Sequence, residues 1–205
     1  MSISKITSSS KKLARVRRSP EASRQNILIA AERLLVSQGP QSLRLADVAT
    51  EAGVANATVL HHFGTIDWVQ AALMEKMIVE LVSGILVMDV PADPRAARAA
   101  ALQNLFDAFE TKGAARLAAW LEMTGESRRL RTVREAVQTV IRQKIRPHDA
   151  DVERLEDAIL VSVILAMGVG LFGPTLGELL GKPKGRARAV ALKLLEERLG
   201  PFEGA

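Results

Sequence analysis

Residues 45–63 read LADVATEAGVANATVLHHF, and this stretch decides the fold that we expect for the chain. The apolar residues of its first half fall on one side of a short helix: Leu45, Val48, Ala49 and Ala52. Gly53 follows and supplies a backbone conformation that a Cβ atom would oppose, so we expect a tight turn there. A second short helix is predicted from about Asn56 to Phe63. Two short helices joined by such a turn predict a helix-turn-helix.

A longer helix precedes this motif and another follows it. Residues 19–21, Ser-Pro-Glu, combine an N-cap, a first-turn proline and a first-turn acid, which favours a helix start. Apolar residues then recur at helical spacing: Ile27, Ala30, Ala31, Leu34 and Leu35. The Gly-Pro pair at residues 39–40 predicts the end of this helix. After the motif, Thr65 can cap a long helix that begins with Asp67 and continues towards Met88.

The remainder of the chain is predicted to be helical as well. We expect helices over 95–111, 114–124, 128–146, 151–172 and 186–199. Because no segment alternates apolar and polar residues for long enough to form a strand, the predicted fold class is all-α. The chain divides into a basic arm that we expect to be disordered (1–18), a helix-turn-helix domain (19–66) and a larger helical domain (67–205).

The positive charge of the chain is concentrated near its N-terminus. The net charge is +5, and residues 1–24 hold seven Lys or Arg residues against one acid, Glu21. A flexible basic arm is typical of segments that bind polyanions, so Arg17, Arg18 and Arg24 are candidate DNA contacts. A solvated tail or a targeting peptide is the alternative.

Residues 24–74 carry a longer pattern, RQNILIAAERLLVSQGPQSLRLADVATEAGVANATVLHHFGTIDWVQAALM. An apolar helix ending in Gly is followed by DVA-x-x-AGV, by T-x-x-x-HF and by a long helix. This segment resembles, without gaps, the N-terminal domain of TetR/AcrR transcriptional regulators. The resemblance implies a bacterial, cytoplasmic homodimer that represses transcription from a palindromic operator in double-stranded DNA. It also implies that a small-molecule effector bound in the C-terminal domain, residues 67–205, releases the DNA.

The resemblance also assigns roles to residues of the motif. Four residues of the second helix would lie against DNA, with the first two at its reading end: Asn56, Ala57, Thr58 and His61. His62 and Phe63 would close the small core. Arg44, just before the first helix of the motif, could reach a phosphate.

Three positions depart from the family pattern. The family usually has Tyr at the position of Leu60 and Lys at the position of Ile66, and both bind phosphate. A Ser or Thr commonly caps the second helix where this chain has Ala55, although Asn56 could cap it one residue later. The loss of two phosphate contacts should weaken DNA binding and flatten its salt dependence. We expect the basic arm to compensate by lying along the DNA backbone or in a minor groove.

An uncharged stretch, AILVSVILAMGVGLFGPTLG, occupies residues 158–177. Its length approaches a membrane span, but glycines and a proline crowd its second half and no aromatic belt flanks it. A helix buried on all sides, as at a dimer interface, explains it better, so we expect no membrane contact. The homodimer would form through helices near 151–172 and 186–199, the second of which has an apolar stripe: Val190, Ala191, Leu194 and Leu195.

Helical bundles bind small, largely apolar ligands between facing helices. Candidate ligand-binding residues are Met77, Phe106, Phe109, Trp120 and Met123, with Arg116 as an orienting polar group. Ordinary core packing is the alternative for each of them. Trp120 is the preferred candidate because a large ring with one polar N–H suits the rim of a pocket.

Other chemistries are disfavoured by the sequence. The chain has no Cys, which excludes disulfides and thiolate metal ligands. Gly168, Gly170 and Gly173 spell G-x-G-x-x-G within an apolar helix, where close helix packing is a better explanation than nucleotide binding. His61 and His62 have no third ligand at a suitable spacing. We therefore expect no cofactor, no metal and no enzymatic activity.

Two functions remain open on these grounds. One is a DNA-binding regulator. The other is a dimeric helical small-molecule-binding protein whose helix-turn-helix no longer reads DNA specifically, as Leu60 and Ile66 could suggest.

Overall fold

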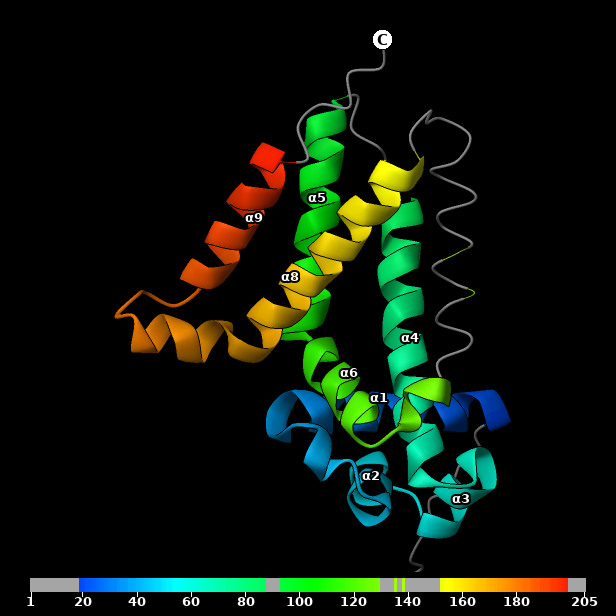
Figure 1. The fold of residues 1–205 in the computed structure, drawn as a ribbon. Helices are drawn as coiled ribbons and strands as arrows, with labels where there is room; N and C mark the ends of the chain where they lie inside the picture. Colours follow the sequence, from blue (N-terminus) through cyan, green and yellow to red (C-terminus); the bar gives the residue numbers. More distant parts are fainter. Residues whose placement is uncertain (1–18, 88–92, 130–134, 136–137, 139–151, 199–205) are drawn as a thin grey trace, which may run out of the picture.

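The computed structural model describes residues 19–87, 93–129, 135, 138 and 152–198, and over these residues the chain is helical without strands (Figure 1). The all-α prediction is confirmed. Because the predicted arm (1–18) and nearly all of the predicted helix at 128–146 lie outside the described residues, the fold is described without them. Residues Glu126–Arg129 form a 3₁₀ turn at the start of that predicted helix.

The N-terminal domain consists of one longer helix, α1 (Pro20–Gln38), and two short ones, α2 (Leu45–Ala52) and α3 (Asn56–Phe63). The start of α1 is fixed as the sequence predicts, because the Ser19 Oγ accepts a hydrogen bond from the Ala22 amide at 3.2 Å. A 3₁₀ turn at Pro40–Ser42 leads into α2. The predicted bounds of α2 and α3 are confirmed.

The α2–α3 turn depends on Gly53. Its φ is +65° and ψ is 36°, the left-handed conformation, and its amide donates back to carbonyls in the last turn of α2. Val48 and Val59 are fully buried where the two helices meet α1, and Val54 is half-buried beside them. Burial of these small apolar side chains holds α2 and α3 at a fixed angle.

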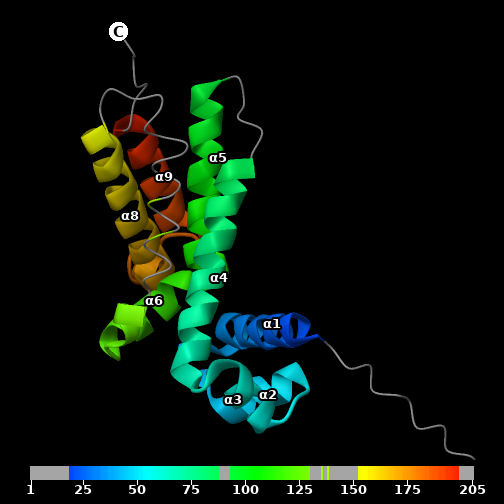
Figure 2. The same ribbon diagram turned by 90° about the vertical axis from the view of Figure 1, so that its right-hand side faces the viewer.

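A long helix, α4 (Ile66–Val87), runs from the N-terminal domain into the second domain (Figure 2). Thr65 caps it as predicted, with its Oγ1 3.4 Å from the Trp68 amide. The next predicted helix, 95–111, consists of α5 (Pro94–Phe106) and a π-helical turn at Asp107–Thr111. The α6 helix (Ala114–Met123) follows after Gly113.

The last two helices are α8 (Val152–Leu179) and α9 (Arg186–Arg198), which pack side by side. The predicted end of α8 at residue 172 is wrong, because the helix continues through Pro174. A proline inside a helix removes one backbone hydrogen bond and kinks the axis. The lower end of α8 accordingly bends away from the body of the domain (Figure 1).

The glycines of α8 differ in their surroundings. A Cβ on Gly170 would lie 2.7 Å from the Phe109 carbonyl oxygen and 2.8 Å from the Ala115 Cβ. Close packing therefore requires glycine at this position, as the sequence suggests. A Cβ on Gly168 would meet nothing within 4 Å, so Gly168 does not share this role.

The two domains are joined by α4 itself and by polar contacts, among them those of α1 with α4 and α6. Lys76 Nζ on α4 lies 2.7 Å from Glu32 Oε2 on α1 and 2.8 Å from Glu80 Oε1. Arg116 on α6 donates to the Val36 carbonyl at the end of α1, with Nη2 3.2 Å from the oxygen. The N-terminal domain is thus attached to both α4 and α6.

Candidate DNA-binding surface and effector regions

The α3 helix presents a largely polar outer surface. Asn56, Ala57 and His61 are exposed, and Thr58 is half-buried. Val59 and Phe63 point into the core, with 0% and 7% of their surface exposed. Three of the four residues predicted to lie against DNA are therefore open to solvent. Exposed amide and imidazole groups on one helix can donate to or accept from base edges in a major groove.

The sequence analysis groups Arg24 with the basic arm, but this residue lies in the first turns of α1. Its Nη1 donates to the His62 carbonyl at 3.2 Å, and its guanidinium carbon lies 4.2 Å from the Phe63 ring centroid. Because the side chain is still exposed, Arg24 supports the C-terminal end of α3 from α1 while its charge remains at the surface. Arg17 and Arg18 lie outside the described residues.

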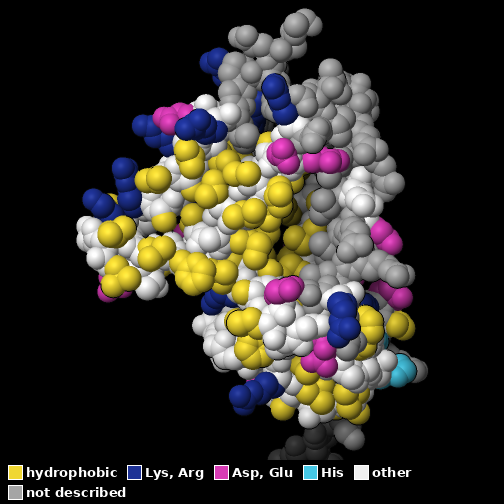
Figure 3. All heavy atoms as spheres, viewed as in Figure 1, with side chains coloured by type: hydrophobic (Ala, Val, Ile, Leu, Met, Phe, Trp, Pro, Cys, Tyr) yellow, Lys and Arg dark blue, Asp and Glu magenta, His cyan; other side chains and the backbone are white. Residues whose placement is uncertain are grey.

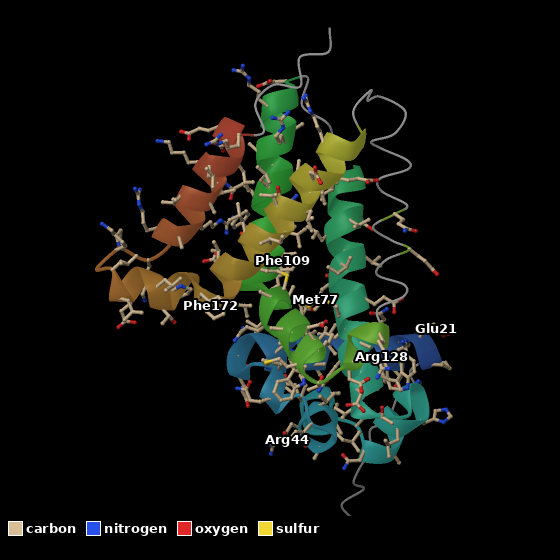
Figure 4. All side chains as sticks on the ribbon, viewed as in Figure 1. Glu21, Arg44, Met77, Phe109, Arg128 and Phe172 are labelled. Carbon is tan, nitrogen blue, oxygen red and sulfur yellow. The ribbon has the colours of Figure 1, made fainter. Side chains whose placement is uncertain are left out.

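The positions that depart from the family pattern offer no polar group to DNA. Leu60 is 43% exposed on α3, and Ile66 is half-buried against the core. Ala55 occupies the N-cap of α3 without a side-chain hydrogen bond, and Asn56 is the first helical residue, so the alternative that Asn56 caps the helix is wrong. Arg44 is exposed at the N-cap of α2 and stands at the edge of the N-terminal domain (Figure 4).

Sequence reasoning missed Asn26, which fixes the motif from α1. Its Nδ2 donates to the Ala52 carbonyl at the end of α2, 2.7 Å away. Asn26 directly precedes the apolar stripe of α1 and is half-buried. A polar residue at the border of an apolar stripe is the signal that could have identified it.

The six predicted ligand-binding residues do not come together at one site. Met77, Phe106 and Phe109 are buried in the core, with 5% or less of their surface exposed (Figure 4). Met123 is 77% exposed, and Arg116 is engaged with the end of α1. These positions favour core packing for the first three residues and a domain contact for Arg116.

Trp120 lies apart from that core, in a groove of about 360 Å³ between the two domains. The groove is bordered by the 3₁₀ turn and the start of α2, by the start of α4 and by the end of α6. Trp120 is half-buried, in keeping with a ring at the rim of a groove.

The outer side of α8 and α9 is apolar and exposed (Figure 3). We call this the α8–α9 face, and its residues are between 43% and 57% exposed: Leu160, Val161, Ile164, Val190 and Leu194. Phe172, Leu176, Leu179 and Leu180 extend it along the bent end of α8. The predicted stripe of α9 is divided, since Ala191 and Leu195 are buried inward while the other two face out.

Within the single chain the apolar helix is exposed on its outer side, so its burial at a dimer interface stays a prediction. Glu156–Leu179 is long and apolar enough to cross a membrane, and only 22% of its apolar 18-residue window is buried. One such helix is weak evidence for a membrane span, since core helices of soluble proteins and signal sequences have the same length and composition.

The described residues contain no group of three or more His, Asp or Glu side chains that could hold a metal ion.

Comparison with known families gives one match. Residues 27–69 match the family described as bacterial regulatory proteins, tetR family. No curated protein matches the chain.

Solved structures match nearly the whole chain. A transcriptional regulator from Rhodococcus sp. Rha1 is 20% identical, with a TM-score of 0.61 over 88% of this chain and 97% of that chain. A fatty acid degradation regulator, FadR, from Bacillus halodurans is 16% identical, with a TM-score of 0.60 over 91% and 98%. A TetR-family regulator from Agrobacterium tumefaciens is 16% identical, with a TM-score of 0.59 over 87% and 98%. The shared feature is the fold, an N-terminal helix-turn-helix domain followed by a helical domain.

Proposed function

Since residues 27–69 form a tetR-family domain and the chain has the fold of TetR-family regulators, we propose that it binds DNA sequence-specifically and regulates transcription. The observation that carries this proposal is the exposure of Asn56, Ala57 and His61 on α3, a helix held rigidly by buried Val59 and Phe63. A helix of eight residues with polar groups on its free side fits a major groove.

The second part of the proposal is a homodimer formed through the α8–α9 face. Five large apolar side chains on two adjacent helices, each at least 43% exposed, are costly to leave in water. Two copies related by a two-fold axis would cover them with a four-helix contact. The axis would place the two α3 helices about 34–36 Å apart. This distance matches two successive major grooves on one face of a duplex with a palindromic sequence.

The third part is repression relieved by a small, largely apolar effector. A regulator of fatty acid degradation is among the proteins that share this fold, which supports an effector of that general character. A ligand can bind better to a state in which the two α3 helices of the dimer lie at a different distance from each other. Such a ligand shifts the population away from the DNA-bound state.

The test is selection from random duplex DNA by the purified protein at two salt concentrations. We expect enrichment of one palindrome with half-sites about one helical turn apart, and survival of that preference at the higher salt. Asn56→Ala and His61→Ala should each reduce the enrichment, while Gln38→Ala, at the exposed end of α1, should leave it unchanged.

A second candidate function follows from Leu60 and Ile66, which provide no polar group for phosphate. In that case the chain is a dimeric small-molecule-binding protein, and the helix-turn-helix is a scaffold. Binding without enrichment, lost at higher salt or after deletion of residues 1–18, would support this second function. Under the main proposal, the same deletion lowers affinity and keeps the sequence preference.

A further inference from the structure

The groove at Trp120 lies where the two domains meet, outside the core of the helical bundle. Its walls are mainly apolar: Leu43 and Leu45 beside α2, Ile66 on α4, and Trp120 on α6. Leu43 is buried, while Leu45, Ile66 and Trp120 are half-buried. A volume of about 360 Å³ bordered by an indole ring and aliphatic chains suits a small planar aromatic molecule.

The floor of the groove contains one buried amide, that of Gln70. This side chain is only 5% exposed, and its Nε2 donates to the Leu43 carbonyl at 3.2 Å. Within the described part of the chain, no protein group donates to its Oε1, although Gln70 borders the groove. An amide oxygen that borders the groove and has no protein donor favours a ligand that brings an O–H or N–H group.

Two charged side chains border the groove, and they differ in how their charges are balanced. The Asp67 carboxylate lies in the first turn of α4, where the helix dipole favours a negative charge, and it accepts from Thr65 Oγ1 at 3.5 Å. The Arg44 guanidinium has no hydrogen-bond or ion-pair partner among the described residues. Of these two charged groups, the guanidinium is the one without a polar contact, so it is the group that would bind an anionic ligand.

We propose that this interdomain groove is an effector site for a small aromatic acid that also carries a hydrogen-bond donor. The ring lies against Trp120, the donor reaches Gln70 Oε1 and the carboxylate pairs with Arg44. This site is separate from the core of Met77, Phe106 and Phe109, and of the ligand-binding candidates from the sequence it includes only Trp120.

Occupancy of the groove would weaken DNA binding, a consequence that rests on the proposed function. Arg44 stands at the N-cap of α2 and is the predicted phosphate contact. A carboxylate that pairs with its guanidinium competes with the DNA phosphate for the same donors. The ligand would also separate α6 from the start of α2 and α4, and Arg116 fixes α6 to α1 on the other side.

The test uses intrinsic fluorescence in the absence of DNA, so its result does not depend on the proposed function. The chain has two Trp residues, and Trp68→Phe leaves Trp120 as the only one. This variant is titrated with 4-hydroxyphenylacetate, 4-methylphenol and tyramine, which share a phenol ring and differ in the charge of the tail. We expect a saturable change for 4-hydroxyphenylacetate and about tenfold weaker binding of the other two.

Arg44→Met should bring the affinity for 4-hydroxyphenylacetate down to that for 4-methylphenol. Arg33→Met, which removes an exposed arginine on α1 that pairs with Glu51 outside the groove, is the matched control and should change nothing. Equal affinities for the three probes, stronger binding of tyramine, or no effect of Arg44→Met would overturn the proposal. In a parallel assay, the acid should lower the affinity of the wild-type protein for its selected duplex.

Discussion

The outer surface of α3 and the α8–α9 face are both exposed, but they are built in opposite ways. The first is polar and rests on a small domain whose helices are joined by specific contacts, such as the hydrogen bond from Asn26 Nδ2 to the Ala52 carbonyl. The second is apolar and has no covering element in the described chain. A polar exposed helix on a rigid support suits contact with nucleic acid, whereas an apolar exposed pair of helices suits contact with a second copy.

The difference also concerns what holds each region in shape. In the N-terminal domain, a left-handed glycine and complete burial of Val48 and Val59 fix α2 and α3. In the second domain, α8 packs closely against the π-helical turn at Gly170 and is kinked at Pro174, while its outer side has no packing partner in the described chain. Changes in one region should therefore affect DNA reading, and changes in the other should affect assembly.

The largest expected effect is on assembly. Ile164→Asp places a charge within the α8–α9 face, which each chain of the proposed dimer would bury. Burial of unpaired charges costs several kcal/mol, so we expect dimerisation to weaken by about 100-fold or more. Sedimentation equilibrium measures this constant. Met123→Glu changes a more exposed apolar residue on α6 and should leave the dimer intact.

The next effect concerns DNA reading without a change in assembly. The double variant Asn56→Ala, His61→Ala should weaken binding to the selected duplex by about 30-fold or more, because two lost base contacts are worth about 1–3 kcal/mol each. Its sedimentation should be that of the wild type. Fluorescence anisotropy of labelled duplex gives the affinity, and an unchanged value would show that α3 does not read the bases.

A smaller effect, on the stability of the fold, is expected where α8 packs against its neighbours, and a second glycine of α8 provides the control. Gly170→Ala forces a Cβ against the Phe109 carbonyl and should lower the free energy of unfolding by about 2 kcal/mol. Gly168→Ala, two residues away with open space around it, should leave stability unchanged or raise it slightly, since Ala favours helix. Urea unfolding separates the two, and equal losses would contradict the close packing at Gly170.

The smallest effect is on the contact between α1 and α4. Burial alone would lower the pKa of Lys76, but its hydrogen bonds to Glu32 and Glu80 outweigh this effect and raise the pKa above its usual value. The stabilisation is therefore complete below the usual lysine pKa and is lost as the pH rises through the raised value. Lys76→Met should cost about 1 kcal/mol at neutral pH and remove part of the alkaline loss of stability. Thermal unfolding across the alkaline range checks both outcomes.

Much of the fold could be predicted from the sequence, because local signals in the N-terminal domain agree with its packing. Ser19, Gly53 and Thr65 mark helix ends by side-chain and backbone chemistry that acts within a few residues. The end of α8 could not be predicted in this way. Gly173 and Pro174 favour a break, but the helix continues with a kink, and Gly170 packs against the π-helical turn.

Of the candidate sites, one could likewise be predicted from local sequence signals and the other could not. The exposure of Asn56, Ala57 and His61 follows from helical spacing within α3. The groove at Trp120 combines the turn before α2, the start of α4 and the end of α6, which are far apart in sequence. Gln70 within an apolar helix is the local sign of that groove, but only tertiary packing shows what surrounds it.

The most direct test of the central claim is the stoichiometry and symmetry of the complex with the selected duplex. Native mass spectrometry of the wild-type protein should show two chains on one duplex whose half-sites are related by a two-fold axis. Ile164→Asp should place one chain on one half-site, with the preferred sequence of that half-site unchanged. A single wild-type chain on an asymmetric site, or an Ile164→Asp variant that still binds as a pair, would contradict the account. In the account, α3 reads the DNA and the α8–α9 face forms the dimer.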